Sequence, residues 1–167
     1  ADQPAETLTY SLGGGADVAL FAIDASTGAL SFKLAPNFEA PADAGGDNVY
    51  NLTVQVSDGT LSSTQAIAIS VTAVNDNTPA ITSSATASVA ENTTAVLTVT
   101  ASDADQPAES LTYSLAGGAD AALFAIDAST GVLSFLTAPD YEAPADAGGN
   151  NVYNLTVQVS DGTLSST

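Results

Sequence analysis

The stretch ADQPAETLTYSL at residues 1–12 returns, with one substitution, as ADQPAESLTYSL at residues 104–115. The similarity continues without a gap, because 55 of the 64 positions in residues 1–64 are identical in residues 104–167. Such near-identity marks a tandem repeat, and its period is 103 residues. Solenoid repeats are shorter, at about 20–50 residues. Each repeat is therefore expected to be a whole domain, of a size that suits a β-sandwich.

Within each repeat the apolar residues alternate with polar ones. Residues 50–56 read YNLTVQV, and residues 67–71, 97–101 and 111–115 alternate in the same way. A period of two with one apolar face predicts half-buried β-strands. Residues 21–32 and their copy at 124–135 predict a hairpin with a glycine-containing loop. Since no segment shows a sustained helical period, the sequence predicts an all-β chain of two tandem antiparallel sandwiches with seven strands per complete unit.

The expected domain boundary is the stretch NDNTP at residues 75–79, which is rich in turn-forming residues. Residues 1–77 would then form a first domain that lacks its first strands. Residues 78–167 would form a second domain that lacks its last strand. The sequence leaves open whether a longer array continues on both sides or whether neighbouring molecules supply the missing strands.

Charge excludes several classes of function. The chain has 19 Asp and Glu against a single cation, Lys33, which gives a formal net charge of −18. Nucleic acids and anionic membranes require basic surfaces, so neither is an expected partner. No apolar run is long enough to cross a membrane, so we expect no membrane insertion. The chain contains no Cys and no His, and its composition fits a bacterial exported protein at the cell surface or outside the cell.

The acidic residues recur at particular places. Asp103 and Asp105 follow a predicted strand at a spacing of two, so both carboxylates point to the same side of an extended chain. Asn75–Asn77 lie at the expected boundary, and Asp161 and its copy Asp58 end strands. Ligands that are all oxygens suit a hard cation, and Ca²⁺ takes about 6–8 of them. The sequence therefore predicts calcium sites.

These motifs make the chain resemble the cadherin-repeat family, in which calcium lies between successive seven-strand Greek-key sandwiches. The early glutamate of that family resembles Glu91. Its Asp-Arg-Glu motif is similar to Asp140-Tyr141-Glu142 and to Asn37-Phe38-Glu39, and its Asp-x-Asn-Asp-Asn linker is similar to residues 73–77. Its Asp-x-Asp motif is Asp103-Ala104-Asp105, and its late aspartate is Asp161.

The resemblance implies a set of calcium ligands. At the junction of the two repeats they are Glu39, Asn75, Asp76, Asn77, Asp103, Asp105 and Asp161. The middle ion would use Glu39, Asp76 and Asp105. The ion nearest the second repeat would use Asn75, Asp103, Asp105, Asp161 and the Asn77 carbonyl. Outer half-sites would use Asp2 and Asp58 towards one neighbour, and Glu91, Asp140 and Glu142 towards the other. Ala73 and Asn37 replace two acidic positions of the family, so one or two ions are expected instead of three.

Each motif also has a plainer interpretation. Asn75–Asn77 could be a simple linker turn, and Asp58 and Asp161 could start hairpin turns. Asp103 and Asp105 could be unrelated surface charges.

Three hypotheses, the first with a variant, follow for the function. The first is a calcium-stiffened spacer in an adhesin or biofilm-type surface protein, whose partners are neighbouring repeats. The second is a calcium-dependent carbohydrate-binding module, which needs exposed aromatic side chains such as Tyr141 or Phe38. The third, hydrolysis by paired carboxylates, is disfavoured because a tandem duplication adds little to a catalytic cleft. A variant of the first hypothesis is homotypic strand exchange into a filament, because unpaired sheet edges recruit strands.

Overall fold

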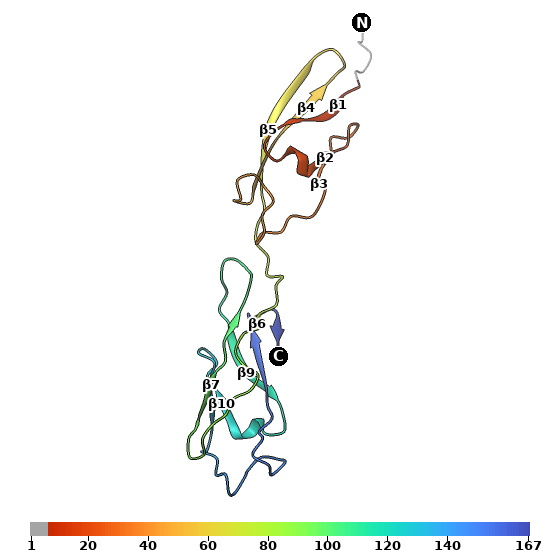
Figure 1. The fold of residues 1–167 in the computed structure, drawn as a ribbon. Coiled ribbons are helices and arrows are strands. Elements are labelled where there is room, and N and C mark those ends of the chain that lie inside the picture. The colour runs from red at the N-terminus through yellow and green to blue at the C-terminus, as the bar shows by residue number, and fades with distance from the viewer. Residues whose placement is uncertain (1–6) are drawn as a thin grey trace. The chain divides into compact units, whose positions relative to one another are not determined.

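The computed structural model describes residues 7–167. The chain divides into two compact units at Val74/Asn75, so the first unit is described over residues 7–74 and the second over residues 75–167. Figure 1 shows that both units consist of β-strands joined by loops, with one short 3₁₀ turn in each. Among residues 7–167 we find no helix of the length and apolarity needed to cross a membrane. Each unit is described below by itself.

The first unit contains two antiparallel sheets. The three-stranded sheet has the order β1-β4-β5, and its strands are Thr9–Gly14, Val49–Ser57 and Ser62–Ser70. The second sheet pairs β2 (Phe21–Ile23) with β3 (Leu30–Phe32), and the 3₁₀ turn η1 (Val18–Leu20) precedes it. The core lies between the sheets, where Phe21, Tyr50 and Leu52 are buried. The Phe21 and Tyr50 rings meet edge to face, with centroids 6.1 Å apart.

The second unit contains three antiparallel sheets. The first has the order β13-β12-β9, with bounds Ser165–Ser166, Thr156–Ser160 and Thr112–Gly117. The second has the order β10-β11-β7, with bounds Phe124–Ile126, Val132–Phe135 and Ala95–Thr98. The third pairs β6 (Ala80–Ile81) with β8 (Ala101–Ser102), and η2 spans Ala121–Leu123. The buried core is Val99, Phe124, Leu133 and Phe135.

The all-β sandwich prediction is confirmed, with local differences. The predicted strand over residues 97–101 is interrupted, because β7 pairs with β11 whereas β8 pairs with β6. The chain thus crosses from one sheet to another at Val99-Thr100. The second compact unit begins at Asn75. Within it, the backbone N–H and the side-chain amide of Asn77 both donate to Asp105.

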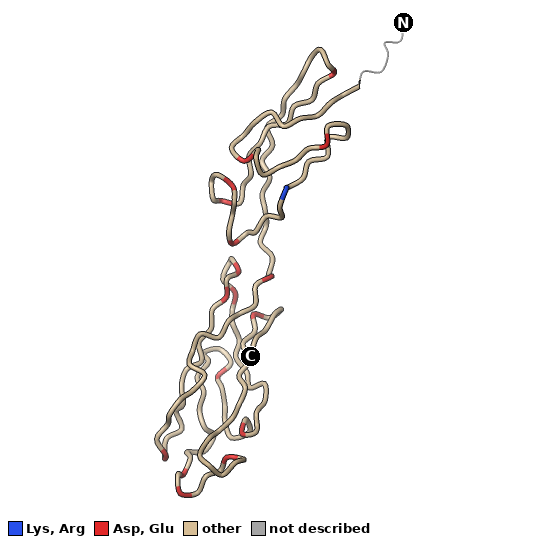
Figure 2. The backbone as a smooth tube through the Cα atoms, turned by 45° about the vertical axis from the view of Figure 1, so that its right-hand side comes forward, with Lys and Arg blue, Asp and Glu red and all other residues tan. Residues whose placement is uncertain are grey.

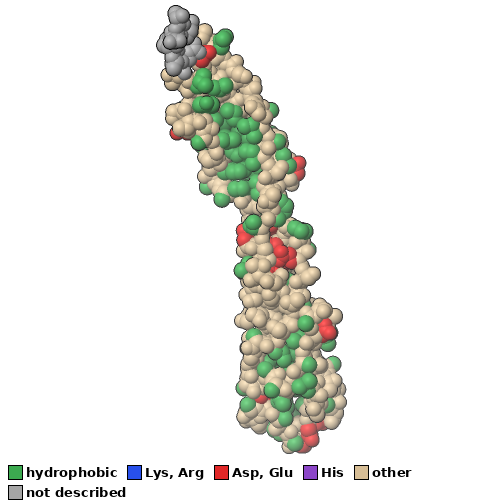
Figure 3. All heavy atoms as spheres, turned by 180° about the vertical axis from the view of Figure 1, so that it is seen from behind, with side chains coloured by type: hydrophobic (Ala, Val, Ile, Leu, Met, Phe, Trp, Pro, Cys, Tyr) green, Lys and Arg blue, Asp and Glu red, His purple; other side chains and the backbone are tan. Residues whose placement is uncertain are grey.

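The two repeats differ in which strands they hold. Residues 80–99, which supply β6 and β7, have no counterpart in residues 7–74, so β3 lacks the neighbour that β7 gives to β11. Phe32 is consequently only half-buried, whereas its copy Phe135 is buried. Figure 3 shows apolar side chains gathered at the surface on one face of the first unit.

Candidate metal centre

Many of the acidic residues lie where the backbone turns, as the red segments of Figure 2 show. Several acidic side chains accept hydrogen bonds from the backbone and so stabilise the fold. Asp120, which is 3% exposed, accepts hydrogen bonds at its two carboxylate oxygens from the backbone of Ala147 and Asn154. Asp17 does the same for Ala44 and Asn51 in the first unit. These buried carboxylates are satisfied by backbone donors and hold loops against strands, so they are not candidate ligands.

Asp103, Asp105 and Asp161 converge in the second unit. One carboxylate oxygen from each lies within 4.8 Å of the others. Asp103 and Asp105 follow β8, and Asp161 follows β12, so two strand ends bring the three side chains together. Asp105 is 2% exposed, which removes it from water. Three like charges at this separation repel one another, and a cation would relieve that repulsion.

The hydrogen bonds leave particular oxygens free for a ligand. Asp161 Oδ1 accepts from the backbone N–H groups of Thr163 and Leu164, at 2.6 and 2.7 Å. Its Oδ2, together with Asp103 Oδ2 and Asn75 Oδ1, is buried and has no hydrogen-bond partner among the described residues. Buried oxygens without partners are costly unless something binds them. A donor set of oxygens alone fits Ca²⁺.

The segment Asn75–Asn77 is bound to the same cluster. Asn77 donates to Asp105 from its backbone N–H at 3.1 Å and from its side-chain amide at 2.7 Å. Asp76 is exposed, and its Oδ1 accepts from the Asn77 side chain at 3.1 Å. This segment is therefore more than a linker turn, because Asn77 also binds a residue of the acidic cluster.

Glu109 also belongs to this cluster, and sequence reasoning missed it. Its Oε2 accepts a hydrogen bond from Asn75 Nδ2 at 2.5 Å. Desolvation raises the pKa of Glu109, and the charges of Asp161, Asp105 and Asp103 raise it further, against the effect of the Asn75 hydrogen bond. The only available signal was its place six residues after Asp103, in a loop whose path the sequence does not specify.

The pKa of Asp161 moves in the opposite direction. Desolvation acts to raise the pKa of Asp161, but the backbone hydrogen bonds from Thr163 and Leu164 outweigh that effect and lower it. These donors stabilise the carboxylate form. Asp161 is thus ionised at neutral pH, as a calcium ligand must be.

A second acidic group lies elsewhere in the second unit. One oxygen each of Glu91, Asp140 and Glu142 lies within 4.8 Å of the others, and all three residues are exposed. Glu91 Oε2 accepts from the Tyr141 backbone at 3.0 Å, and Asp140 Oδ1 accepts from the Glu142 backbone at 3.0 Å. The structure thus brings together the three residues predicted for the outer half-site. Exposed acidic groups are common without an ion, so this group by itself does not define a site.

The remaining predicted ligands belong to the first unit or lie beyond the described residues. Glu39 is in the first unit, and its participation with Asp76 and Asp105 stays a prediction. Asp58 Oδ1 accepts from the backbones of Thr60 and Leu61, as its copy Asp161 does at the equivalent turn. Asp2 lies outside the described residues.

Aromatic side chains are mostly turned inwards. Tyr50 is 1% exposed, and Tyr113 and Tyr153 pack against the core of the second unit. Tyr141, at 66% exposed, stands apart from them. A single exposed tyrosine is a poor platform for a sugar ring.

The sequence of this chain is similar to those of cadherins. Residues 85–167 match the family model described as "Cadherin domain". The chain is 33% identical to human "Protocadherin Fat 1" and 36% identical to mouse "Cadherin-related family member 2", over 92% of its own length in each case. It spans only 3% and 12% of these two proteins.

Solved structures show the same fold. The structure of human Protocadherin-24 EC1-2 superimposes with a TM-score of 0.71 at 22% identity, covering 95% of this chain and 72% of that one. Mouse Cadherin-23 EC22-24 gives a TM-score of 0.64 at 26% identity, covering 95% of this chain and 50% of that one. Residues 85–167 therefore form a cadherin domain, and residues 1–64, which repeat residues 104–167, are part of a second copy of it.

Proposed function

We propose that this chain is a calcium-stabilised structural repeat of an adhesive protein at a bacterial cell surface or outside the cell. The observation that carries the proposal is the group Asp103, Asp105 and Asp161, two of which hold a buried carboxylate oxygen that has no hydrogen-bond partner in residues 7–167. Calcium supplies the charge and the coordination that these oxygens lack. The cadherin match supports an adhesive, non-enzymatic role.

The ligands of the proposed site come from the boundary stretch and from the rest of the second unit. Asp103, Asp105 and Asp161 provide carboxylates, Asn75 provides its side-chain oxygen and Asn77 its backbone carbonyl. Glu109 adds a fourth carboxylate close to these residues. Glu39 of the first repeat would hold a further ion together with Asp76 and Asp105, and the outer groups would serve neighbouring repeats. Binding that requires the ordered arrangement stiffens the junction and stabilises it by mass action.

The alternative of a carbohydrate-binding module has less support. Three of the tyrosines pack inside the two cores, and the relatives are cadherins. The bacterial origin rests on composition alone.

Calcium titration tests the proposal. We expect saturable binding by calorimetry and a melting temperature that rises with Ca²⁺ and falls in chelator. Asp103→Asn should weaken binding by at least about tenfold, since it removes one charged ligand worth more than about 1.4 kcal/mol.

Asp47→Asn is the matched control, because it removes one charge and the copy of Asp47 in the second repeat is Asn150. It should leave calcium affinity unchanged. Equal melting with and without chelator would contradict the proposal.

A further inference from the structure

The two ends of the Asn75 side-chain amide have different surroundings. Its Nδ2 donates to Glu109 Oε2 at 2.5 Å, whereas its Oδ1 is buried and has no hydrogen-bond partner among the described residues. Two other buried oxygens of the second unit share this lack of a partner, Asp103 Oδ2 and Asp161 Oδ2. Asn75 is also a close neighbour of Asp161. The amide thus lies between one carboxylate that accepts from it and others whose oxygens are without a donor.

Glu109 can hold only one end of this amide. An ionised carboxylate accepts hydrogen bonds and donates none, while an amide has a donor nitrogen and an acceptor oxygen that a half-turn exchanges. Glu109 therefore selects the orientation in which Nδ2 faces it and Oδ1 is turned away. A hydrogen bond to a charged acceptor is roughly twice as strong as one between neutral groups, so the selection is firm.

Glu109 lies at the margin of the acidic cluster. It supplies no oxygen to the group in which Asp103, Asp105 and Asp161 lie within 4.8 Å of one another. It is exposed, whereas Asp105 is 2% exposed. This position suits a residue that acts on the cluster through Asn75, and it does not suit a direct ligand.

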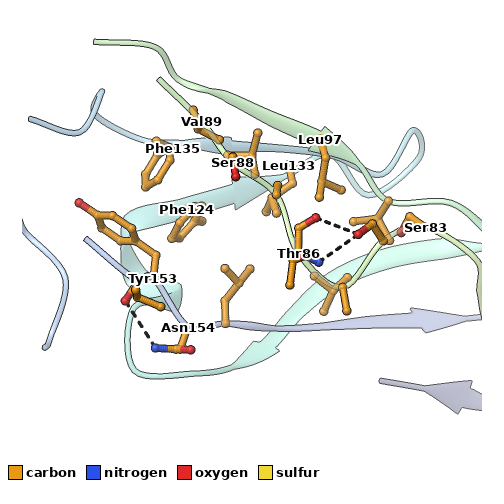
Figure 4. Close-up of a pocket in the computed structure, with 18 of the residues that line it drawn as sticks. Ser83, Thr86, Ser88, Val89, Leu97, Phe124, Leu133, Phe135, Tyr153 and Asn154 are labelled. Carbon is orange, nitrogen blue, oxygen red and sulfur yellow. Dashed lines mark hydrogen bonds between the residues drawn. The ribbon is translucent and has the colours of Figure 1, made fainter. Parts of the chain in front are cut away.

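The contact between Asn75 and Glu109 is also separate from the apolar core of the second unit. Figure 4 shows Phe124 and Phe135 of that core beside Tyr153. Neither Asn75 nor Glu109 packs against this core. A substitution of Glu109 is therefore expected to leave the fold intact, with an unchanged melting temperature in chelator.

We propose that Glu109 is a positioning residue, which holds the Asn75 amide so that its oxygen is available to Ca²⁺ and its N–H groups stay away from Asp103 and Asp161. The inference rests on the proposed calcium function. Without Glu109, the amide N–H groups would bond to the unpartnered oxygens of Asp103 and Asp161, because these are the charged acceptors that remain. Calcium would then have to break those bonds and turn the amide before it could bind.

A double-mutant cycle in the full chain tests the proposal. Calcium affinity is measured for the parent, Glu109→Ala, Asn75→Ala and the double variant, in about 0.15 M sodium chloride to screen the effect of the lost charge. The backbone amide signals of Thr163 and Leu164, followed by nuclear magnetic resonance, report this site because both groups donate to Asp161.

We expect Glu109→Ala to weaken calcium binding at least about tenfold in the parent chain. In the Asn75→Ala chain the same substitution removes a charge but no amide contact. Its effect there should be at least about fivefold smaller. A residue that acted only through its charge, or as a direct ligand, would give the same loss in both chains.

The orientation of the amide is a second readout that needs no calcium. In chelator, the Asn75 Nδ2 protons of the parent should give strong nuclear Overhauser effects to the Glu109 Cγ protons. In Glu109→Ala, their effects to the Cβ protons of Asp103 or Asp161 should strengthen, since the amide turns towards these acceptors. A role of Glu109 in the fold alone would leave the amide in place.

The outcomes separate this inference from the proposed function. Absence of saturable calcium binding by the parent overturns the proposed function and this inference with it. Saturable binding with equal fold losses in the two backgrounds overturns this inference alone. Nδ2 contacts that Glu109→Ala leaves otherwise unchanged, in a parent chain that binds calcium, also overturn this inference alone.

Discussion

At the scale of single residues, Asp161 combines two roles on its two oxygens. Oδ1 accepts hydrogen bonds from the backbone of Thr163 and Leu164 and so holds the turn, whereas Oδ2 is buried and has no hydrogen-bond partner in the described part of the chain. Both interpretations that the sequence left open, hairpin turn and metal ligand, therefore fit the same side chain. Asp161→Asn keeps an acceptor oxygen for the turn and removes the charge. We expect it to weaken calcium binding by at least about tenfold while the melting temperature in chelator stays near that of the parent.

Asp161→Ala separates the two roles further. It removes the turn acceptor as well, so it should lower both the calcium affinity and the melting temperature in chelator. Calorimetry and thermal unfolding measure the two quantities. An Asp161→Asn chain that binds calcium like the parent would remove Asp161 from the site.

Gly131 and its copy Gly28 allow a matched comparison of backbone strain. Both have positive φ, of 70° and 74°. A Cβ on Gly131 would lie 2.2 Å from the Val99 carbonyl oxygen, whereas a Cβ on Gly28 would meet the Tyr10 ring at 3.0 Å. Gly28→Ala should cost about 1 kcal/mol from backbone conformation alone. Gly131→Ala should cost roughly 2 kcal/mol or more, because the backbone of Val99 must also shift. Urea unfolding measures both, and equal losses would contradict the argument.

At the scale of elements, the sequence predicted strands well where the partner strand is present. The alternation in residues 50–56 predicted β4, and the hairpin prediction matches β2 and β3. The sequence VYNLTVQVS forms β4 at residues 49–57 and recurs at residues 152–160, where only Thr156–Ser160 form a strand. Strand formation therefore depends on pairing with a segment that lies far away in the sequence. The acidic cluster was also predicted only in part. The sequence identified Asp103 and Asp161 by their spacing and their position after strands. It did not identify Glu109, because the loop that brings Glu109 to the cluster has a path that the sequence does not specify.

The Asp side chains of the hairpin turns lead us to expect that the fold is sensitive to acid. Hydrogen bonds from Thr130 and Ser129 lower the pKa of Asp127, and those from Ser26 and Thr27 lower the pKa of Asp24. A depressed pKa stabilises the fold above the ordinary value of 3.8, and this stabilisation is lost as the pH falls through the folded-state pKa. We expect the melting temperature in chelator to stay level down to about pH 5 and to fall below pH 3.8.

A chain with both Asp24→Asn and Asp127→Asn tests the assignment. It should start from a lower melting temperature at neutral pH and lose less of it on acidification. If parent and variant lose the same amount, other carboxylates govern the acid response.

At the scale of the whole molecule, the dominant property is the net charge of −18. Self-repulsion on this scale opposes compact structure, and dissolved ions weaken it by screening. The Debye length shrinks from about 30 Å at 0.01 M salt to about 8 Å at 0.15 M. Calcium would act in a second way, because it binds particular oxygens. Stabilisation by calcium must therefore be separated from stabilisation by ionic strength.

Sodium chloride, magnesium and calcium distinguish the two effects. Sodium chloride should raise the melting temperature gradually, and Mg²⁺ should add little at constant ionic strength, because it retains its water and demands octahedral geometry. Ca²⁺ should raise it further and saturate. Asp103→Asn should abolish most of the calcium-specific rise and leave the sodium response intact, since screening does not depend on one side chain. If Mg²⁺ matches Ca²⁺ at equal concentration, the acidic groups act only as diffuse charge.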